Sequence, residues 1–256
     1  MDKNYQPIKD IFLNNTNQEQ DITGTWNLER CQMIAISYAL TEGAICVLGD
    51  SRYNHSYCYY GNFADHLGLP EEERLDIIPS LYEDFLFSRV HPDDLRQRHI
   101  HELAFLNFTR DMNAKERRNY YMEDRMRVSN ADGNWIDMEH KCRYLVSSAE
   151  GAYLLILCVY RPAVQSAEPD YQSACIIDIR NGQRKLLTSK DYSQLLSPRE
   201  LDVLRLINRG KLSKEIAEEL CIALNTVNRH RQSILAKLKV DNAIEACTLA
   251  KRMGLL

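Results

Sequence analysis

The sequence has no apolar run long enough to cross a membrane, and it contains little glycine or proline. Its longest uninterrupted apolar stretch, residues 152–160, is about half as long as a transmembrane helix. With 10 Gly, 7 Pro and 45% hydrophobic residues among 256, the composition is typical of a globular protein and excludes a collagen-like or disordered chain. The first ten residues, MDKNYQPIKD, lack the apolar segment of a secretory signal, so we expect a cytoplasmic protein without membrane contact.

The motifs of common enzymes and metal sites are also missing. The eight cysteines are never closer than twelve residues apart, so no Cys-x-x-Cys pair exists. Most of them lie in apolar strings, and in a reducing compartment we interpret them as small buried hydrophobic residues. There is no phosphate-cradling Gly-rich loop, no Gly-x-Ser-x-Gly and no cluster of metal-ligand residues in the sequence. We therefore expect no enzymatic activity and no metal site, and no cofactor is evident.

Charge is distributed unevenly along the chain. The net charge is -4, but residues 197–256 carry 11 Lys and Arg against 7 Asp and Glu, which leaves 21 against 29 for residues 1–196. A carboxyl-terminal module of charge +4 therefore follows a body of charge -8. This division favours a polyanionic partner for one end of the protein only.

Hydrophobic periodicity predicts a mixed domain in the first part of the chain. Apolar residues recur at helical intervals over 28–40, and a proline followed by two acids marks the start of a second helix at residue 92. Four short segments have the composition or the apolar–polar alternation of strands, and a fifth strand segment follows them. The last of these segments is apolar on both faces, so we expect it to be central in an antiparallel sheet of about five strands. The expected helices cover residues 28–40 and 92–108, and the expected strands cover 44–48, 55–60, 122–128, 136–144 and 153–160.

Three sequence landmarks in this region resemble those of a PAS sensor domain, in the same order. They are the run Tyr59-Tyr60-Gly61-Asn62-Phe63 to Leu67-Gly68-Leu69-Pro70, the segment Val90-His91-Pro92-Asp93-Asp94, and Asp132-Gly133-x-Trp135. The resemblance implies a sheet whose concave face holds a small molecule or haem, or packs against a partner. A pocket filled by the domain's own side chains is the alternative, and both stay open.

Several polar residues interrupt the predicted core. His140 lies on the apolar face of its strand and is a candidate ligand-binding residue, although a hydrogen-bonded core histidine is the favoured interpretation. Asp124 also lies on a buried face, where a carboxylate needs a partner, and we expect an arginine rather than a ligand. His99 and His101 are two residues apart on a predicted helix, so they point in different directions and do not form a metal pair.

A second module begins near the end of the chain. Ser197 and Glu200 form a capping box that starts a helix running to about Asn208, and Gly210 ends it. Ser213 is expected to cap a second helix over residues 214–220. After a tight turn, a third helix runs from residue 225 to about residue 239.

Helical phase separates an apolar and a polar side of the third helix. Its apolar stripe, which packs inward, is made of Val227, His230, Ile234 and Leu238. Its opposite side carries amides, a guanidinium group and a small residue, namely Asn225, Asn228, Arg229, Gln232 and Ala236. Amides and guanidinium groups bond adenine and guanine edges in the major groove, so two short helices and this third one predict a helix-turn-helix.

This module resembles LuxR-type regulators nearly position for position. The matching segments are residues 196–204, 213–217, 225–231 and 234–238. The resemblance implies contacts with double-stranded DNA, and dimerisation through a fourth helix over residues 242–252. Its expected DNA-binding residues are Lys214, Asn225, Thr226, Val227, Asn228, Arg229, Arg231, Gln232 and Lys237. Among them Arg231 and Lys237 are expected at phosphates and Arg229 at a base.

The sequence departs from the LuxR pattern at two positions. Ala223 stands where the family usually has a serine, which removes a side-chain acceptor from the start of the third helix. Asn228 replaces a commoner lysine, which lowers the expected non-specific affinity for DNA.

Taken together, the patterns predict an α+β chain with a PAS-like antiparallel sheet and a carboxyl-terminal all-α helix-turn-helix domain. The expected divisions are a lead at residues 1–27, a sensor domain at 28–162, a linker with a β-hairpin at 163–192 and the DNA-binding domain at 193–256. The predicted function is a homodimeric transcription regulator controlled by a signal or partner. The rival is an interaction protein that sequesters a partner regulator without binding DNA, and an enzyme comes third.

Overall fold

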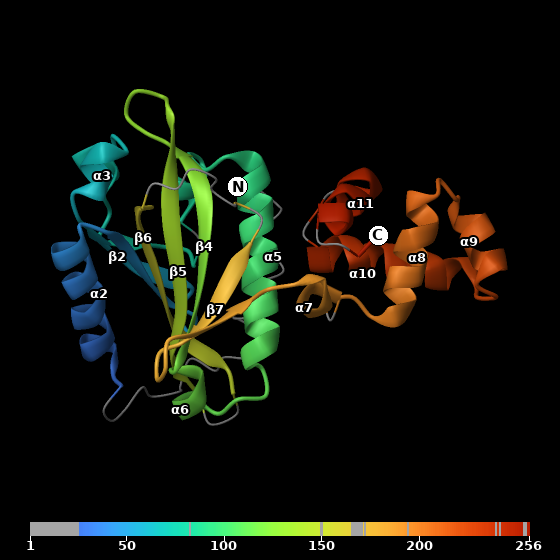
Figure 1. The fold of residues 1–256 in the computed structure, drawn as a ribbon, viewed down its shortest axis with the longest axis horizontal. Helices are drawn as coiled ribbons and strands as arrows, with labels where there is room; N and C mark the ends of the chain where they lie inside the picture. Colours follow the sequence, from blue (N-terminus) through green and yellow to red (C-terminus); the bar gives the residue numbers. More distant parts are fainter. Residues whose placement is uncertain are drawn as a thin grey trace.

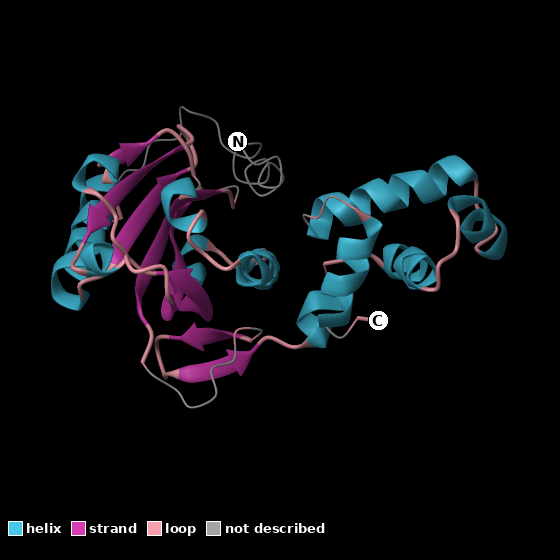
Figure 2. Cartoon of the chain, turned by 90° about the horizontal axis from the view of Figure 1, so that it is seen from above, coloured by secondary structure: helices cyan, strands magenta, loops and turns pink. Residues whose placement is uncertain are grey.

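A computed structural model describes residues 26–256 except 82, 149–150, 165–170, 172, 194, 239, 241 and 253–254. Nearly all of the predicted lead at residues 1–27 therefore lies outside the described residues. A sheet with helices on both faces is followed by a helical module, and a short helix leads from one to the other (Figure 1, Figure 2). This arrangement confirms the predicted α+β class.

Helices cover both faces of the sheet and make up the whole carboxyl-terminal module. The helices are α2 (Leu28–Glu42), α3 (Phe63–His66), the 3-10 turn η2 (Glu71–Glu73), α4 (Asp84–Phe87), α5 (Pro92–Thr109), α6 (Ala114–Arg117), α7 (Ser189–Ser193), α8 (Pro198–Asn208), α9 (Ser213–Glu219), α10 (Leu224–Leu238) and α11 (Ala243–Arg252). The strands are β1 (Ile45–Asp50), β2 (His55–Tyr60), β3 (Ile77–Ile78), β4 (Tyr120–Ser129), β5 (Trp135–Ser147), β6 (Tyr153–Pro162), β7 (Ala174–Asp178) and β8 (Gln183–Leu186).

The eight strands form one antiparallel sheet in the order β3-β2-β1-β6-β5-β4-β7-β8. The prediction that β6 is central is confirmed, since it pairs with β1 on one side and β5 on the other. The sheet is larger than the expected five strands because the two-residue β3 and the β7–β8 hairpin extend its edges. That hairpin was predicted inside the linker, but β7 pairs with β4, for example Met122 with Ile176.

One face of the sheet is covered by α2. Asn27 starts this helix by accepting a hydrogen bond from the Arg30 amide at 2.9 Å, and Gly43 ends it in a left-handed conformation. The helix buries Cys31, Ala35 and Ala39, which are spaced four residues apart and lie on one side of it. Small side chains at these three positions let α2 pack close to the side chains of β6 that face this helix.

The other face of the sheet is covered by α5 (Figure 1). Its first turn is fixed by Asp94, whose carboxylate accepts hydrogen bonds from the Arg127 amide, Nε and Nη2 of β4 at 2.9, 2.8 and 2.6 Å. Farther along, α5 touches α7, where the rings of His101 and Tyr192 stack with centroids 6.3 Å apart. The helix therefore connects the sheet to the segment that leads into the helical module.

No helix among the described residues combines the length and the apolar character that a membrane crossing requires.

Candidate nucleic-acid interface and buried polar cluster

The start of α8 is the predicted capping box. The Ser197 hydroxyl accepts from the Glu200 amide at 3.3 Å, and the Ser197 amide donates to Glu200 Oε2 at 2.6 Å. Glu200 also accepts from Ser233 Oγ at 2.6 Å and Lys237 Nζ at 2.7 Å, so one buried carboxylate ties α8 to α10. Burial raises the pKa of this carboxyl group, but Lys237, Ser233 and the Ser197 amide outweigh burial and lower it to about 2.

The second helix begins one residue earlier than the sequence predicts. Ser213 is the first helical residue of α9 rather than its cap. The free amide of Leu212 instead donates to the Glu215 carboxylate at 2.7 Å, so the acceptor comes from inside the helix. The end of α9 is fixed to α8 by Arg199, whose Nη2 donates to the Leu220 carbonyl at 2.5 Å. The following turn is tight, with Cys221 at a φ of 52°.

The division of α10 into two sides is confirmed by burial. Val227, Ile234 and Leu238 are buried, and His230 is half-buried at the edge of this stripe. The opposite side is exposed over five residues, which are Asn225, Asn228, Arg229, Gln232 and Ala236. The apolar stripe packs on α8 and α9, so the helix presents its polar side outward.

The four polar side chains of that exposed side are available to a partner. Asn225, Asn228, Arg229 and Gln232 make no side-chain hydrogen bond or ion pair with any residue that the structure describes. We call these four residues the polar face of α10. Holding amides and a guanidinium unpaired on one rigid helix keeps their hydrogen-bonding capacity for a ligand with complementary edges.

The remaining predicted contact residues lie in different environments. Lys214 is exposed on α9 and Thr226 is half-buried at the start of α10. Val227 is fully buried and anchors α10 to the core, whereas the resemblance implies that it contacts DNA. Arg231 is half-buried. Burial raises the pKa of the Cys247 thiol on α11, and the charges of Lys251 and Arg231 only partly offset that rise. Lys237 is exposed but is paired with Glu200.

A second cluster of polar side chains lies in the core of the sheet domain. Asp124 accepts from two histidines, with Oδ1 2.9 Å from His140 Nδ1 and Oδ2 2.8 Å from His101 Nδ1. The prediction of an arginine partner for Asp124 is therefore wrong. Strand pairing places His140 directly opposite Asp124, and α5 brings His101 over them. Sequence reasoning missed His101 because its partner lies on another element.

His140 is buried and is hydrogen-bonded through Nδ1, as a core histidine would be. Burial and the Arg98 guanidinium lower the pKa of this side chain, but the Asp124 carboxylate outweighs them and raises it to about 9. Its ring also stacks on Tyr160 with centroids 4.8 Å apart. The other ring nitrogen, Nε2, has no hydrogen-bond partner among the described residues.

Arg98 is the centre of a network that sequence analysis missed. Its guanidinium donates to Glu102 and to the Tyr160 hydroxyl at 2.8 and 3.1 Å, and that hydroxyl donates to Glu83 at 3.3 Å. Burial raises the pKa of Glu83, whereas Arg98 outweighs burial at Glu102 and lowers the pKa of that carboxyl group to about 2. The only signal in the sequence was the number of polar residues along α5.

Glu83, Arg98 and Glu102 border a small cavity under α5. Its volume is about 40 Å³, which is enough for a few water molecules or a small ion. Six of its lining residues bear on the chemistry, namely Glu83, Arg98, Glu102, Cys142, Tyr144 and Cys158. The sheet domain thus contains an interior polar site in addition to the exposed face of α10.

The fold of residues 198–252 defines a helix-turn-helix module with a fourth helix. Residues 194–250 match the family model of bacterial regulatory proteins, luxR family, so this module is a LuxR-type helix-turn-helix domain. The match covers under a quarter of the chain and does not extend to the sheet domain. The PAS-like assignment therefore stays a prediction.

Known relatives match the same end of the chain. The transcriptional regulatory protein DesR of Bacillus subtilis (strain 168) is 49% identical over 84 residues, which cover 31% of this chain and 42% of DesR. LiaR of the same strain, also a transcriptional regulatory protein, is 46% identical over 61 residues, covering 24% of this chain and 29% of LiaR. This chain therefore spans less than half the length of these relatives.

Two solved structures have low similarity over larger shares of the chain. A Vibrio cholerae VqmA dimer has a TM-score of 0.32 and 15% identity, covering 90% of this chain and 88% of that one. A sensory box histidine kinase/response regulator from Burkholderia thailandensis has a TM-score of 0.35 and 16% identity, covering 52% and 84%. At these scores neither structure supports a conclusion about this chain.

Proposed function

We propose that this protein is a cytoplasmic transcription regulator that binds promoter DNA as a homodimer through α10. The observation that carries the proposal is the unpaired, exposed polar face of α10. A solvated helix surface does not require unpaired amides and a guanidinium at these positions, whereas the major groove does. The similarity of residues 194–250 to the luxR family supports the same function.

The polar face assigns a role to each side chain. Arg229 suits bidentate bonding to guanine, and Asn225, Asn228 and Gln232 suit adenine. The small Ala236 allows the helix to approach the groove closely. Lys214, Thr226 and Arg231 lie toward the rim and would contact phosphates, which fix position rather than sequence. A phosphate near Lys237 would share its ammonium with Glu200.

Regulation would come from the sheet domain, for which we propose a PAS-like sensing role over residues 28–162. A small polar molecule in the cavity, or a partner on the sheet, would favour one position of α5. Because α5 contacts α7 through His101 and Tyr192, that preference would pass to the segment before α8. Two recognition helices in a dimer must match half-sites about one DNA turn apart, so a small change in their spacing alters affinity.

The direct test is selection of genomic fragments by the full chain, followed by titration of the best site at several salt concentrations. We expect the logarithm of the affinity to fall linearly with the logarithm of salt concentration, with a slope of about -0.9 per phosphate contact. Absence of enriched fragments, or an affinity that hardly depends on salt, would reject DNA binding and favour the rival role of sequestering a partner regulator.

Paired variants separate base contacts from phosphate contacts. We expect Arg229→Ala to cost about 1–3 kcal/mol on the selected site and to relax preference at one base position. Lys214→Ala should weaken binding to all DNA sequences about equally. It should also reduce the slope of log affinity against log salt concentration by about 1 for each copy in the complex. Arg96→Ala is the control, because Arg96 is an exposed cation on α5 far along the chain from the module. Equal scaling by both variants would contradict the assigned face.

A further inference from the structure

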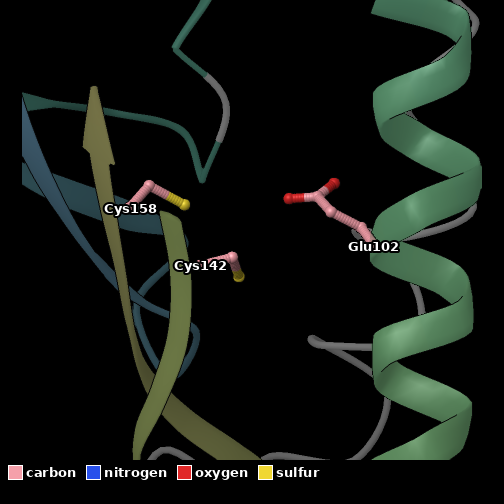
Figure 3. A group of neighbouring side chains, drawn as sticks. All are labelled: Glu102, Cys142 and Cys158. Carbon is pink, nitrogen blue, oxygen red and sulfur yellow. The ribbon is translucent and has the colours of Figure 1, made fainter. Parts of the chain in front are cut away.

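We infer that Glu102, His140, Cys142 and Cys158 form a binding site for a divalent transition-metal ion of the zinc class. The carboxylate of Glu102 and the Sγ atoms of Cys142 and Cys158 lie within 4.8 Å of one another. Figure 3 shows the two cysteines on the sheet and Glu102 on α5, with all three side chains directed into the space between these elements. The same three residues line the cavity described above.

The fold, rather than sequence spacing, creates this cluster. Cys142 and Cys158 are sixteen residues apart, but they are directly paired across β5 and β6. Both belong to the core on the α5 side of the sheet, where Glu102 is the facing residue. The expectation of no metal site relied on the missing Cys-x-x-Cys motif, and cross-strand pairing supplies two adjacent thiols without that motif.

His140 completes a set of four ligands. It precedes Cys142 by two residues on β5 and therefore lies on the same face of the strand. Its Nδ1 is held by Asp124 at 2.9 Å, while the buried Nε2 has no hydrogen-bond partner among the described residues. A carboxylate on the far ring nitrogen is the usual arrangement of a metal-binding histidine. A metal ion would give Nε2 the partner that it lacks.

The charge of the cluster suits a divalent cation. Binding releases the two thiol protons to solvent, so one dication replaces two protons and the buried charge from this exchange is unchanged. When the His140 ring is protonated, its Nε2 proton leaves as well. Arg98 remains within 2.8 Å of Glu102 and balances the ligand set, since three anionic ligands and a dication carry a net charge of -1. A carboxylate has enough lone pairs to accept from Arg98 and bind the ion.

The ligand types select the metal. Thiolate and imidazole ligands favour zinc-class ions over magnesium or calcium, and four N, S and O ligands match a tetrahedral structural site. Metal–sulfur bonds of about 2.3 Å require ligand separations near 3.7 Å, so the side chains would move inward by about 1 Å. Rotation about the χ angles of Glu102 and the two cysteines provides this range.

The test is a titration of the full chain with Co²⁺ alone, after chelation and in the presence of a phosphine reductant. We expect one Co²⁺ per chain, with a sulfur-to-cobalt charge-transfer absorption and the ligand-field bands of tetrahedral cobalt. Zn²⁺ should displace the cobalt and remove the colour. Absence of the charge-transfer absorption at one equivalent of Co²⁺ would overturn the proposal.

Variants assign the ligands. Cys142→Ser and Cys158→Ser should each weaken Co²⁺ binding by on the order of 100-fold or more, since loss of an outer partner alone costs roughly 10- to 100-fold. Asp124→Asn removes such an outer partner and should fall in that lower range. Cys175→Ser is the matched control, because Cys175 is half-buried on β7 outside the cluster. Unchanged absorption in both cluster variants would reject the site.

Alkylation of the unmodified chain keeps the proposal testable if the cysteine variants fail to fold. Cys142 and Cys158 of the folded chain should react more slowly with iodoacetamide when Zn²⁺ is present, as measured on the peptides that contain them. Cys175 should react at the same rate with and without Zn²⁺. Equal rates at Cys142 and Cys158 with and without Zn²⁺ would overturn the proposal.

Discussion

Glu200 holds α10 against α8 through hydrogen bonds and an ion pair. It is buried at the start of α8 and bonds the Ser197 amide on its own helix, together with Ser233 and Lys237 on α10. Its capping role was visible in the sequence. The two bonds to α10 were not, because they join residues more than thirty positions apart.

Replacing Glu200 tests this link through its pH dependence. The folded pKa of Glu200, about 2, lies below the ordinary value of 4.5. The contribution of this carboxylate to stability is therefore complete above pH 4.5 and is lost as the pH falls toward 2. We expect Glu200→Gln to destabilise α8 and α10 by about 2 kcal/mol at pH 7, and by progressively less below pH 4.5. Amide hydrogen exchange, compared with the unmodified chain at each pH, measures the difference. The exposed Glu218→Gln is the control, and a pH-independent difference would contradict the assignment.

Ala223 offers a stabilising substitution at the same scale. Its carbonyl accepts from the Thr226 and Val227 amides at 2.9 and 3.2 Å, so it occupies the cap position of α10 without a side-chain acceptor. We expect Ala223→Ser to stabilise the start of α10 by about 1 kcal/mol, and Ala223→Val, whose side chain also has no acceptor, to give no such gain. Hydrogen exchange in the first turn of α10 measures both. Equal effects of the two variants would show that the hydroxyl does not cap the helix.

At the scale of elements, α5 has the bounds that the sequence predicts but a more polar inner face than expected. Its bounds agree with prediction to one residue, yet the face that it turns to the sheet buries Gln97, Arg98 and His101. Arg98 is paired with Glu102 and Tyr160, His101 is paired with Asp124, and the Gln97 amide nitrogen lies 3.2 Å from His101 Nε2. A helix with a polar inner face supplies a site rather than only a core.

The junction between α2 and β2 depends on a glycine that the sequence motif contains. A Cβ at Gly61 would lie 2.3 Å from the Ala39 carbonyl oxygen and 2.4 Å from the Gly43 carbonyl carbon, and backbone atoms cannot yield. We expect Gly61→Ala to lower the free energy of unfolding by about 3 kcal/mol. Gly182→Ala, which meets no atom within 4 Å but has a φ of 71°, should cost only about 1 kcal/mol. Denaturant titration measures the free energy of unfolding of both variants. A smaller loss for Gly61→Ala than for Gly182→Ala would contradict the close backbone packing at Gly61.

At the scale of the whole molecule, two sites of different kinds share one chain. The polar face of α10 is exposed, whereas the network around Asp124 and Arg98 is interior to the sheet domain. In the part of the chain that the structure describes, α7 and its ring contact with His101 link the sheet domain to the start of α8. Regulation by the proposed mechanism therefore requires two copies whose spacing that connection controls.

Dimerisation can be tested on the fourth helix. Ile244 is 80% exposed on α11, the helix through which the LuxR-type resemblance implies dimerisation. We expect Ile244→Glu to shift the full chain from dimer to monomer in sedimentation and to lower the affinity for a two-half-site DNA at least tenfold. Val164→Glu changes another exposed apolar residue, outside the module. This variant should leave the dimer and the affinity for DNA unchanged. A dimer that survives Ile244→Glu would place the interface elsewhere.

The sequence by itself determined the features that depend on neighbours along the chain. Capping residues, helical phase and strand alternation are local, so they gave the start of α8, the outward side of α10 and the central place of β6. Tertiary structure decided what depends on distant segments. Strand register brought Cys142 beside Cys158, the packing of α5 gave Asp124 two histidines instead of an arginine, and β4 accepted the hairpin assigned to a linker. These pairings follow from how elements pack in space, which no short-range pattern specifies.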